Sequence, residues 1–452
     1  MSIKLALVYP PVDAKHVAMR DSGMTPPLHL LALAAAVGRT MDVDIQIFDG
    51  NLMDLDAVLT KLSLFSPDVI GMNADLTNYD NAVKVANATS ARVILGGNYA
   101  AFLADQILHR QPRVEAVCFN DGEDALCGFI RGDINAPNLI HRGGRNPVKL
   151  LDIKELPTPA YDLVNMDDYF QRQADVFGPN FRMMQFYGQK GCLNMPHCTF
   201  CGRYEDGMRL RDPALYSREV IHYVEKFALT EVWDRSDSYL QSGKWFSTVF
   251  QNLKVLPVTF KTYARADQLF DRNIAMMKEM GFRMVYIGYE AGDDSILAKM
   301  NKNETVAQYR DATKRVLDAG IDIDASFIIG LPGETRETLA NQLQFVRDMA
   351  ELGLRKIKVN RVLVLPGTPL YRTVCEKYPK VGAMDSLDTP DLQRKLYSTY
   401  DLSGFDGVDG FIEAINATAA EMVKVVTDAG GCAEGYGYGS KALDKGDSGA
   451  VR

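Results

Sequence analysis

Short apolar runs alternate with helix-like stretches along the first third of the chain. The first run, IKLALV, ends at the Pro10–Pro11 turn, and the others end in Gly, Asn or Asp; they are DVDIQIFDG (42–50), PDVIGMNAD (67–75), ARVILGG (91–97) and VEAVCFND (114–121). Helical patterns such as LHLLALAAAVGRT, from Leu28, lie between most of them. Strands that alternate with helices predict an α/β domain with a parallel, doubly wound sheet over residues 1–150.

The loops that follow these strands are the expected ligand-binding positions of this domain, because ligands of doubly wound sheets lie at the carboxyl ends of the strands. They are residues 73–77, 96–99 and 120–123. Glycine at 96 and 97 permits close approach of a ligand to the backbone, and a tight strand-to-helix turn explains the pair equally well. No G-x-G-x-x-G follows the first strand, so the dinucleotide-binding fingerprint is absent.

A second series of strand and helix patterns occupies residues 181–375, after a predicted linker at 151–180. The strand-like runs are FRMMQFYG (181–188), TEVWDRS (230–236), PVTFKTYARAD (257–267), RMVYIGYEAGD (283–293), DIDASFIIGLPGE (322–334) and KIKVNRVLVLPG (356–367). Six strand–helix steps predict an open (β/α)6 partial barrel, whose functional groups gather at the carboxyl strand ends. Residues 376–452 are expected to be mainly helical, with a flexible glycine-rich tail.

Composition and charge narrow the class of protein. Of 452 residues, 47% are hydrophobic and 24% are charged, which is typical of a soluble globular protein with two or three domains. The net charge of −8 gives no basic face for a nucleic acid or an anionic membrane. No signal peptide or membrane-spanning run is expected, and seven cysteines without a regular framework favour reduced thiols in the cytoplasm.

Three of the seven cysteines fall inside ten residues of GQKGCLNMPHCTFCGR (188–203), with the spacing C-x5-C-x2-C; they are Cys192, Cys198 and Cys201. Closely spaced thiolates bind zinc or iron, and a structural zinc ion normally has four protein ligands. The other cysteines are distant in sequence, and His197 is adjacent to Cys198, which makes joint ligation of one ion awkward. The spacing therefore favours a [4Fe–4S] cluster with one open iron, with chance clustering as the alternative.

Taken together, the motifs resemble the radical S-adenosylmethionine (SAM) enzymes, in the branch with an N-terminal cobalamin-binding domain. The resemblance covers roughly residues 3–375. It rests on GCLNMPHCTFCGR, YIGYEAGDDSILAKMNK, AGIDIDASFIIGLPGET and LPGTPLY in the second region, and on PDVIGMNADLTNYDNAVKVA, ILGGNYAAFLADQIL and AVCFNDGEDAL in the first.

The resemblance implies a site for the cluster and SAM at the barrel mouth. The three cysteines would hold the cluster, and SAM would chelate its open iron. SAM contacts are expected from Phe200, Asp234, Ser236, Arg265, Glu290, Ser326 and Gly330. Arg265 would pair with the SAM carboxylate or with Glu290. The alternatives are core packing for Phe200, a helix cap for Glu290, and a plain turn at GLPGE in which Glu334 caps the next helix.

The resemblance also implies a cobalamin site in the first domain. None of the six histidines lies in a D-x-H-x-x-G motif, so no cobalt-coordinating histidine is expected from it. Corrin or cobalt contacts are expected from Asn73, Asp75, Thr77, Gly96, Gly97, Asn98, Gly122 and Glu123. A domain that no longer binds cobalamin is the alternative.

The chain departs from the family pattern at two places. The usual cluster spacing is C-x3-C-x2-C, so LNMPH contains two extra residues; we expect it to bulge outward and to bring His197 or Asn194 toward the active site. Lys190 replaces the usual Arg and keeps the positive charge. In the C-terminal tail, a bolder hypothesis makes Cys432, Tyr436 and Tyr438 a lid over the barrel mouth or radical partners.

The function that this resemblance implies is methyl transfer from SAM, through methylcobalamin, to an unactivated carbon or phosphorus of a small molecule. An external electron donor such as a flavodoxin or ferredoxin would supply electrons. The alternatives are a radical ring rearrangement, cyclisation or C–C bond reaction without methyl transfer, and a non-catalytic protein that binds a cluster or cobalamin. The sequence does not indicate the substrate.

Overall fold

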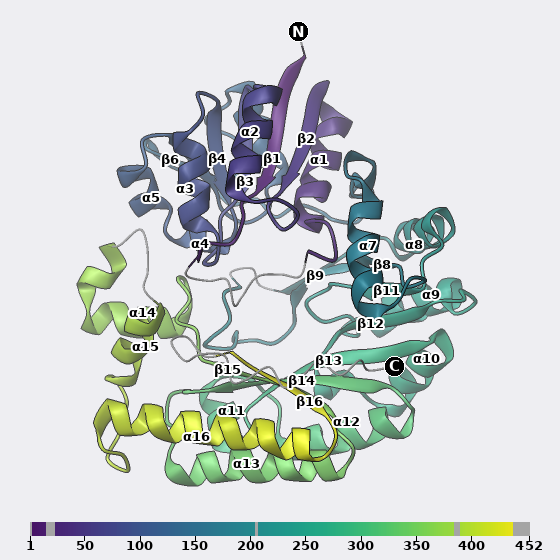
Figure 1. Ribbon diagram of the computed structural model, residues 1–452, viewed down its shortest axis with the longest axis vertical. Helices are drawn as coiled ribbons and strands as arrows, with labels where there is room; N and C mark the ends of the chain where they lie inside the picture. The colour runs from purple at the N-terminus through teal and green to yellow at the C-terminus, as the bar shows by residue number, and fades with distance from the viewer. Residues whose placement is uncertain (1, 15–22, 204–206, 384–388, 437–452) are drawn as a thin grey trace.

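The computed structural model describes residues 2–14, 23–203, 207–383 and 389–436. Two β-sheets dominate it, one formed by the N-terminal region and one by the rest of the chain (Figure 1). Each contains seven strands with helices packed against it. The predicted α/β class is therefore confirmed.

The N-terminal sheet has the strand order β2-β1-β3-β4-β5-β6-β7. Its first five strands pair in parallel; they are β1 (Ile3–Tyr9), β2 (Val43–Asp49), β3 (Val69–Asn73), β4 (Arg92–Gly96) and β5 (Val114–Cys118). The short edge strands β6 (Leu139–His141) and β7 (Gly144–Arg145) pair antiparallel. The order 2-1-3-4-5 is a doubly wound topology. The direction in which successive strands are added changes between β1 and β3, which are neighbours in the sheet.

Helices cover both faces of this sheet. The strand β1 has apolar side chains on both faces, and each set is buried under helices. Leu5 and Leu7 pack in the core with α1 (Leu28–Thr40) and α6 (Glu123–Arg131). Ala6 and Val8 belong to the opposite core, with α2 (Leu55–Phe65), α3 (Tyr79–Asn87), α4 (Asn98–Phe102) and α5 (Ala104–Arg110). Continuous apolar strands are what a parallel sheet buried on both faces requires.

The second sheet is parallel throughout and runs β8-β11-β12-β13-β14-β15-β16. Its first six strands occur in the predicted order; they are β8 (Met183–Phe186), β11 (Glu231–Asp234), β12 (Thr259–Ala264), β13 (Phe282–Glu290), β14 (Asp322–Ile329) and β15 (Lys356–Arg361). The intervening helices are α8 (Pro213–Phe227), α9 (Gly243–Leu253), α10 (Asp271–Met280), α11 (Asp294–Lys299), α12 (Val306–Asp318) and α13 (Arg336–Glu351). This confirms the six predicted steps of the partial barrel.

The C-terminal region corrects one expectation. The segment Cys432–Tyr436, expected to be flexible, forms a seventh strand, β16, beside β15. Cys432 pairs with Lys356, the first residue of β15, so it lies at the amino end of the strands. The hypothesis that Cys432 folds over the barrel mouth is therefore wrong, because the mouth is at the carboxyl end. Tyr436 pairs with Asn360 nearer that end, and Tyr438 lies outside the described residues.

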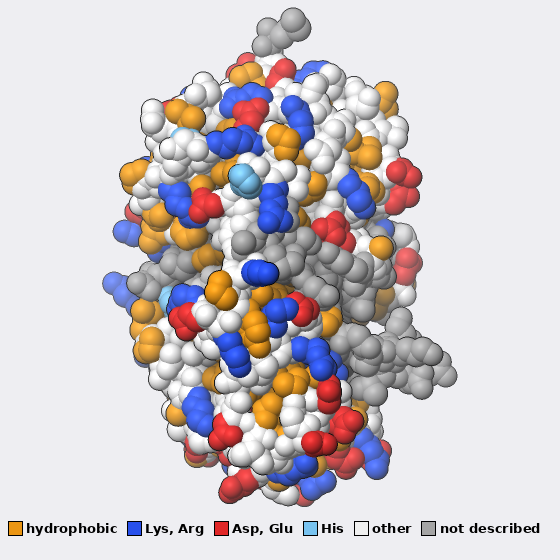
Figure 2. Space-filling model, turned by 90° about the vertical axis from the view of Figure 1, so that its left-hand side faces the viewer, with side chains coloured by type: hydrophobic (Ala, Val, Ile, Leu, Met, Phe, Trp, Pro, Cys, Tyr) orange, Lys and Arg blue, Asp and Glu red, His pale blue; other side chains and the backbone are white. Residues whose placement is uncertain are grey.

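Four further helices complete this region: α14 (Pro369–Lys377), η4 (Pro379–Ala383), α15 (Thr389–Tyr397) and α16 (Gly407–Asp428). The longest of them, α16, packs against α13 and β16 (Figure 1). In the part of the chain that the structure describes, no helix has the length and hydropathy needed to cross a membrane. On the face shown in Figure 2, acidic and basic side chains are interspersed.

The expected linker at 151–180 contains the short helix η2 (Tyr161–Leu163) and the helix α7 (Met166–Phe177), which contacts both sheets. The hydroxyl of Tyr169 donates to Asp49 at the end of β2, at 2.9 Å. The amide of Gln173 binds the backbone N–H and C=O of Met183 in β8, at 2.7 and 2.9 Å. This segment therefore links an edge strand of each sheet.

Candidate active site

The cysteine motif lies on a hairpin that follows β8 and is held by the loop after β11. The hairpin consists of β9 (Gln189–Cys192) and β10 (Gly207–Leu210), which pair antiparallel. Ser236 Oγ accepts from the amides of Gly188 and Gln189, at 3.1 and 2.9 Å. Asp237 Oδ2 accepts from the Gly191 amide at 2.7 Å. The backbone that leads into Cys192 is therefore positioned before any ligand binds.

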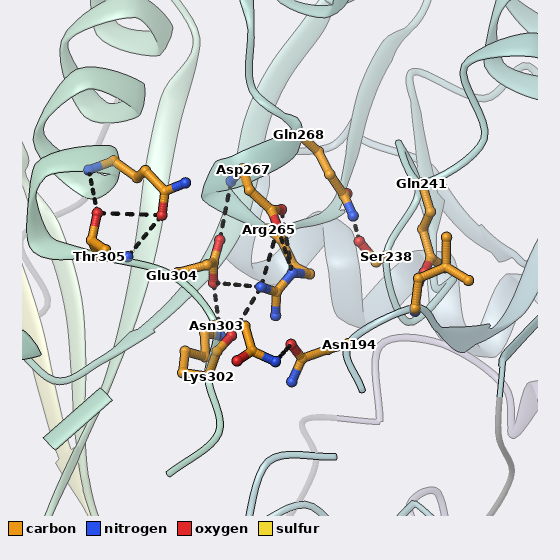
Figure 3. A network of polar contacts seen from close by, with 12 residues as sticks. Asn194, Ser238, Gln241, Arg265, Asp267, Gln268, Lys302, Asn303, Glu304 and Thr305 are labelled. Atoms are coloured by element: carbon orange, nitrogen blue, oxygen red, sulfur yellow. Dashed lines mark hydrogen bonds and ion pairs between the residues drawn. The ribbon is translucent and has the colours of Figure 1, made fainter. Parts of the chain in front are cut away.

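A single side chain, Gln241, holds the start of the insert. Its Oε1 accepts from the Leu193 amide, and its Nε2 donates to the Gly191 carbonyl, both at 2.8 Å. Gln241 comes from the segment just before α9 and is labelled in Figure 3. Both groups of this amide are thus used on the two residues that flank Cys192.

The three thiols are half-buried and lie within electrostatic reach of one another. Burial raises the pKa of Cys198 to about 11, while Lys302 opposes the rise and Glu290 and Cys201 add to it. Burial also raises the pKa of Cys201, and Cys192 contributes. Ligation to iron would ionise these thiols, as metal binding does generally.

No three His, Cys, Asp or Glu side chains among the described residues are placed to hold one metal ion. A [4Fe–4S] cluster does not need such convergence, because each cysteine ligates a different iron. Three half-buried thiols on one loop therefore fit a cluster better than they fit a single zinc ion.

The LNMPH insert is only partly directed outward. Leu193 and Met195 are 54% and 48% exposed, as the predicted bulge requires. Asn194, by contrast, is 8% exposed, and its Nδ2 lies 3.2 Å from Cys198 Sγ. His197 is half-buried, and its carbonyl accepts from Asn301 Nδ2 at 3.4 Å. The insert therefore brings the side chain of Asn194 against a motif cysteine, as one of the two expected possibilities required.

A buried charge network lies beside the cysteine loop (Figure 3). Lys302 Nζ lies 3.4 Å from Glu290 Oε1 and 3.4 Å from Glu304 Oε2. Arg265 Nη2 donates to the Lys302 carbonyl at 2.9 Å and lies 3.5 Å from Glu304 Oε2. It also pairs with Asp267 at 3.2 Å. The expected pairing of Arg265 with Glu290 is therefore replaced by Asp267 and Glu304, and Lys302 is the partner of Glu290.

Glu290 is held in a strained conformation at the end of β13. Its φ is +62°, which a non-glycine residue adopts at a cost, and such strain is concentrated at functional sites. Burial raises the pKa of Glu290, and Lys302 counteracts this. Sequence reasoning missed Lys302 and Glu304, although Lys302 ends the motif YIGYEAGDDSILAKMNK. The available signal was that Lys302 follows, within the same motif, the acidic residue Glu290 at the end of an apolar strand.

Three of the other expected SAM contacts are engaged with the protein itself. Asp234 Oδ2 accepts from the hydroxyl of Tyr216 at 2.8 Å, and Ser236 supports β9 as described above. At Gly330, where φ is +88°, a Cβ would lie 2.5 Å from the hydroxyl of Tyr397, so this tyrosine packs closely against the glycine. The Gly330 amide donates to Glu334 at 2.9 Å.

These three and two other expected SAM contacts, Phe200 and Ser326, stay predictions. Phe200, on the cysteine loop, packs partly against the main core. Ser326 lies on β14, and its Oγ is 3.5 Å from Asn360 Nδ2.

A cavity of about 590 Å3 lies between the carboxyl edge of the N-terminal sheet and the β9 strand. Six of the eight residues expected to contact cobalamin line it: Asn73, Gly96, Gly97, Asn98, Gly122 and Glu123. Asp75 and Thr77 are not among the lining residues. Asp75 Oδ1 instead accepts from the amide and hydroxyl of Thr77, at 2.8 and 2.6 Å, which closes the turn after β3.

The two glycines at the end of β4 have different roles. At Gly97, whose φ is +98°, a Cβ would lie 2.9 Å from the Ala74 carbonyl, so glycine is needed for a tight turn. At Gly96 the nearest atom to a Cβ would be 3.9 Å away, and this residue lines the cavity. The tight-turn interpretation therefore holds at Gly97, and close approach of a ligand to Gly96 stays a prediction.

Ion pairs join the cavity wall to the cysteine hairpin. Lys190 on β9 lies 3.2 Å from Asp121 and 3.8 Å from Glu123, both after β5. Arg209 on β10 binds the same Asp121 at 2.5 Å. Burial alone would raise the pKa of Asp121, but Arg209 and Lys190 outweigh it and hold the pKa below its usual value.

The cavity also adjoins the cysteine loop directly. Arg203, two residues after Cys201, and Asp237, which binds the Gly191 amide, both line it. Asn98 Nδ2 lies 3.5 Å from the Gly202 carbonyl. His29, which sequence reasoning did not select for the site, faces the cavity, where desolvation lowers its pKa to about 4. The imidazole is therefore neutral at pH 7.

The chain is similar to several known proteins. Residues 187–346 match the family described as the radical SAM superfamily. A protein named as an uncharacterized methyltransferase, from Pyrococcus horikoshii, is 26% identical over 82% of this chain and 82% of its own length. The anaerobic magnesium-protoporphyrin IX monomethyl ester cyclase of Rubrivivax gelatinosus is 24% identical over 72% of this chain and 63% of its own length.

Two solved structures have the same fold at 16% sequence identity. One is the radical SAM methyltransferase TsrM from Kitasatospora setae, with cobalamin and a [4Fe–4S] cluster bound; its TM-score is 0.67, over 83% of this chain and 78% of that one. The other is the cobalamin-dependent radical SAM enzyme OxsB with aqua-cobalamin bound, with a TM-score of 0.66 over 79% of this chain. The match spans about half of OxsB, 53% of its length.

The family match includes the three motif cysteines, the charge network and four of the six predicted barrel strands, β11 to β14. Residues 187–346 therefore form a radical SAM domain, and the chain has the fold of the cobalamin-dependent radical SAM enzymes TsrM and OxsB.

Proposed function

We propose that this radical SAM enzyme transfers a methyl group from SAM, by way of cobalamin, to an unactivated carbon or phosphorus of a small molecule. The observation that carries the proposal is the cavity at the carboxyl edge of the N-terminal sheet, which is bordered by the cysteine hairpin. A methyl carrier in this cavity would lie next to the barrel mouth, where SAM-binding groups of such barrels gather.

The residues present fit both groups. Cys192, Cys198 and Cys201 would hold the cluster, and the open side of Gly96 leaves room for a large planar ligand in the cavity. When bound, the cluster supplies one electron for cleavage of SAM, and cobalamin supplies a carrier for the methyl group. An external donor such as a flavodoxin or ferredoxin would reduce the cluster.

The chain's own residues position and shield these groups. Lys302 fixes the Glu290 carboxylate at the end of β13, where it would accept hydrogen bonds from the hydroxyl or ammonium groups of SAM. Lys190 and Arg209 tie the cavity wall to the hairpin through Asp121 and so fix the distance between the two sites. His29 lines the cavity with an imidazole that is neutral at pH 7, because desolvation lowers its pKa to about 4.

Product analysis tests the proposal. The reconstituted enzyme is incubated with SAM, a reductant and candidate acceptors, with and without cobalamin. S-adenosylhomocysteine together with 5′-deoxyadenosine, dependent on cobalamin, is the expected result. Formation of 5′-deoxyadenosine alone, with cobalamin bound and substrate consumed, would contradict methyl transfer.

A second candidate is a radical cyclisation or rearrangement without methyl transfer. The similarity to the magnesium-protoporphyrin ester cyclase favours it, although the match omits more than a third of that protein's length. The same assay separates the two candidates, because a cyclisation consumes substrate without forming a methylated product.

A further inference from the structure

We infer that Asn194, in the insert between the first two motif cysteines, donates a hydrogen bond to the sulfur of Cys198 and thereby raises the reduction potential of the cluster. The inference rests on the cluster assignment and not on methyl transfer. It gives the two extra residues of the C-x5-C spacing a purpose: they turn an amide inward.

The geometry of the insert supports a direct contact. Asn194 Nδ2 lies 3.2 Å from Cys198 Sγ, which is within hydrogen-bonding distance for sulfur. Asn194 is buried, whereas its neighbours Leu193 and Met195 are about half-exposed. The backbone on the amino side of Asn194 is held by Gln241 through the Leu193 amide at 2.8 Å. The insert is thus anchored so that one of its side chains points toward the sulfur.

Neighbouring groups determine which end of the amide faces the sulfur. Asn303 Nδ2 donates to Asn194 Oδ1 at 3.0 Å, the contact drawn in Figure 3. The Asn301 carbonyl accepts from Asn194 Nδ2 at 2.8 Å. A flipped amide would place Oδ1 against that carbonyl and Nδ2 against the Asn303 donor. The network therefore assigns the N–H2 group to the side of Cys198.

The loop 301–303 is shaped to hold this amide. Asn301 and Asn303 have positive φ angles of 54° and 53°, which asparagine tolerates better than most residues. In the thiol form, Cys198 Sγ also lies 3.8 Å from the Asn301 carbonyl, where the thiol donates. A ligating thiolate has no proton to donate, so its contact in this network is the donor on Asn194.

Electrostatics give the direction of the effect. A donor directed at a ligating sulfur stabilises negative charge on the cluster, and the reduced cluster carries one more negative charge than the oxidised cluster. Hydrogen bonds to the sulfurs are among the factors that set the potential of iron–sulfur clusters. The Asn194 amide therefore makes the cluster easier to reduce.

The test is a redox titration of the reconstituted full-length protein without SAM or cobalamin, followed by the EPR signal of the reduced cluster. Asn194→Leu keeps a similar volume and removes the donor; its midpoint potential should shift to more negative values with the iron content unchanged. Leu193→Ala, an exposed neighbour in the same insert, is the matched control and should leave the potential at the wild-type value. An unshifted Asn194→Leu protein with full iron would overturn the inference.

A second measurement does not depend on the variant folding. Wild-type protein with 15N-labelled asparagine is reduced and studied by pulsed EPR. A resolved asparagine nitrogen coupling to the cluster is expected, and no such coupling would overturn the inference. Failure of the cluster assignment itself is distinguishable, because a Cys198→Ala protein would then retain its full iron content.

Discussion

The carboxyl edges of the two sheets both face the candidate active site and both carry ion pairs, but most of the residues that line the cavity belong to the N-terminal region. The N-terminal edge is lined by Gly96, Gly97 and small amide side chains that leave a cavity open. The barrel edge is filled by buried charges, with Glu290, Lys302 and Glu304 in contact. The first edge provides room for a large ligand, and the second provides fixed charges that need no rearrangement when a ligand binds.

Two carboxyl groups show how the environments differ. Asp121, on the N-terminal edge, is surrounded by Arg209 and Lys190, which hold its pKa below the usual value against the effect of burial. Glu334, at the turn after β14, is buried and accepts backbone N–H groups, and burial raises its pKa to about 8. One carboxyl is therefore charged at pH 7 and the other is largely neutral.

The largest expected effect is on the barrel edge. Cys198→Ala should lose most of its iron after anaerobic reconstitution and lose all SAM cleavage, because the remaining two thiols cannot hold the cluster in place. Iron analysis and 5′-deoxyadenosine formation measure this. Cys432→Ala, at the amino end of the sheet, is the control and should match the wild type in both.

On the N-terminal edge, Gly96→Leu should fill the cavity and abolish retention of cobalamin through gel filtration, while the iron content stays at the wild-type level. The visible spectrum of the eluted protein gives both quantities. Gly38→Leu makes the same change at an exposed position of α1 with no atom within 4 Å and should retain cobalamin. Equal retention by both variants would show that the cavity is not the binding site.

Lys302→Met leaves the buried carboxylates Glu290 and Glu304 without this partner. Removing one member of a buried ion pair costs about 3–5 kcal/mol of unfolding free energy. Urea unfolding followed by circular dichroism measures the loss. A cost below about 1 kcal/mol would mean that these charges are solvated and that the barrel edge is not preformed.

Glu334→Gln should change stability in a pH-dependent way. In the folded protein the pKa is about 8, well above the unfolded value of about 4.3, so the wild type loses stability as pH rises between these values. The glutamine variant lacks this penalty and should be more stable by on the order of 1–3 kcal/mol at pH 8.5, with no difference near pH 4. Denaturant titrations at the two pH values provide the comparison.

Asp121→Asn should show the opposite sign. Its folded pKa is lowered, so its contribution is complete above the unfolded pKa of about 3.9 and is lost as pH falls through the folded value. The variant should be less stable by about 1–2 kcal/mol at pH 7 and should approach the wild type in acid. A variant with the same deficit at both pH values would point to lost packing and not to lost charge.

Strand positions were accessible from the sequence because parallel strands are continuous apolar runs that end in turn residues. All five parallel strands of the first sheet and six of the second matched their predicted runs. The strand β16 was missed, because CAEGY combines glycine with polar residues and an edge strand needs little apolar character. The helix α7 was missed within a segment that was taken for a linker.

At the candidate site, motifs within one segment could be predicted from the sequence, whereas the ion-pair partners of the site residues could not. The cysteine motif and the cavity glycines stood out by their spacing. Lys302 as the partner of Glu290, and Asp267 and Glu304 as those of Arg265, depend on how separate loops converge. Gly330 was selected correctly as a close-approach position, but the approaching group is Tyr397 from α15.

The sequence by itself determined the class of fold and the positions of eleven parallel strands along the chain. It also determined the three thiols of the cluster motif and the glycine pair at the end of the fourth strand. These are set by hydrophobic periodicity and by residue spacing within one segment, which need no knowledge of distant contacts. Only the tertiary structure decided that Asn194 faces Cys198, that Lys190 joins the hairpin to Asp121, and that Cys432 lies far from the barrel mouth. Each of these depends on which segments pack together, because burial and ion pairing arise between parts of the chain that are distant in sequence.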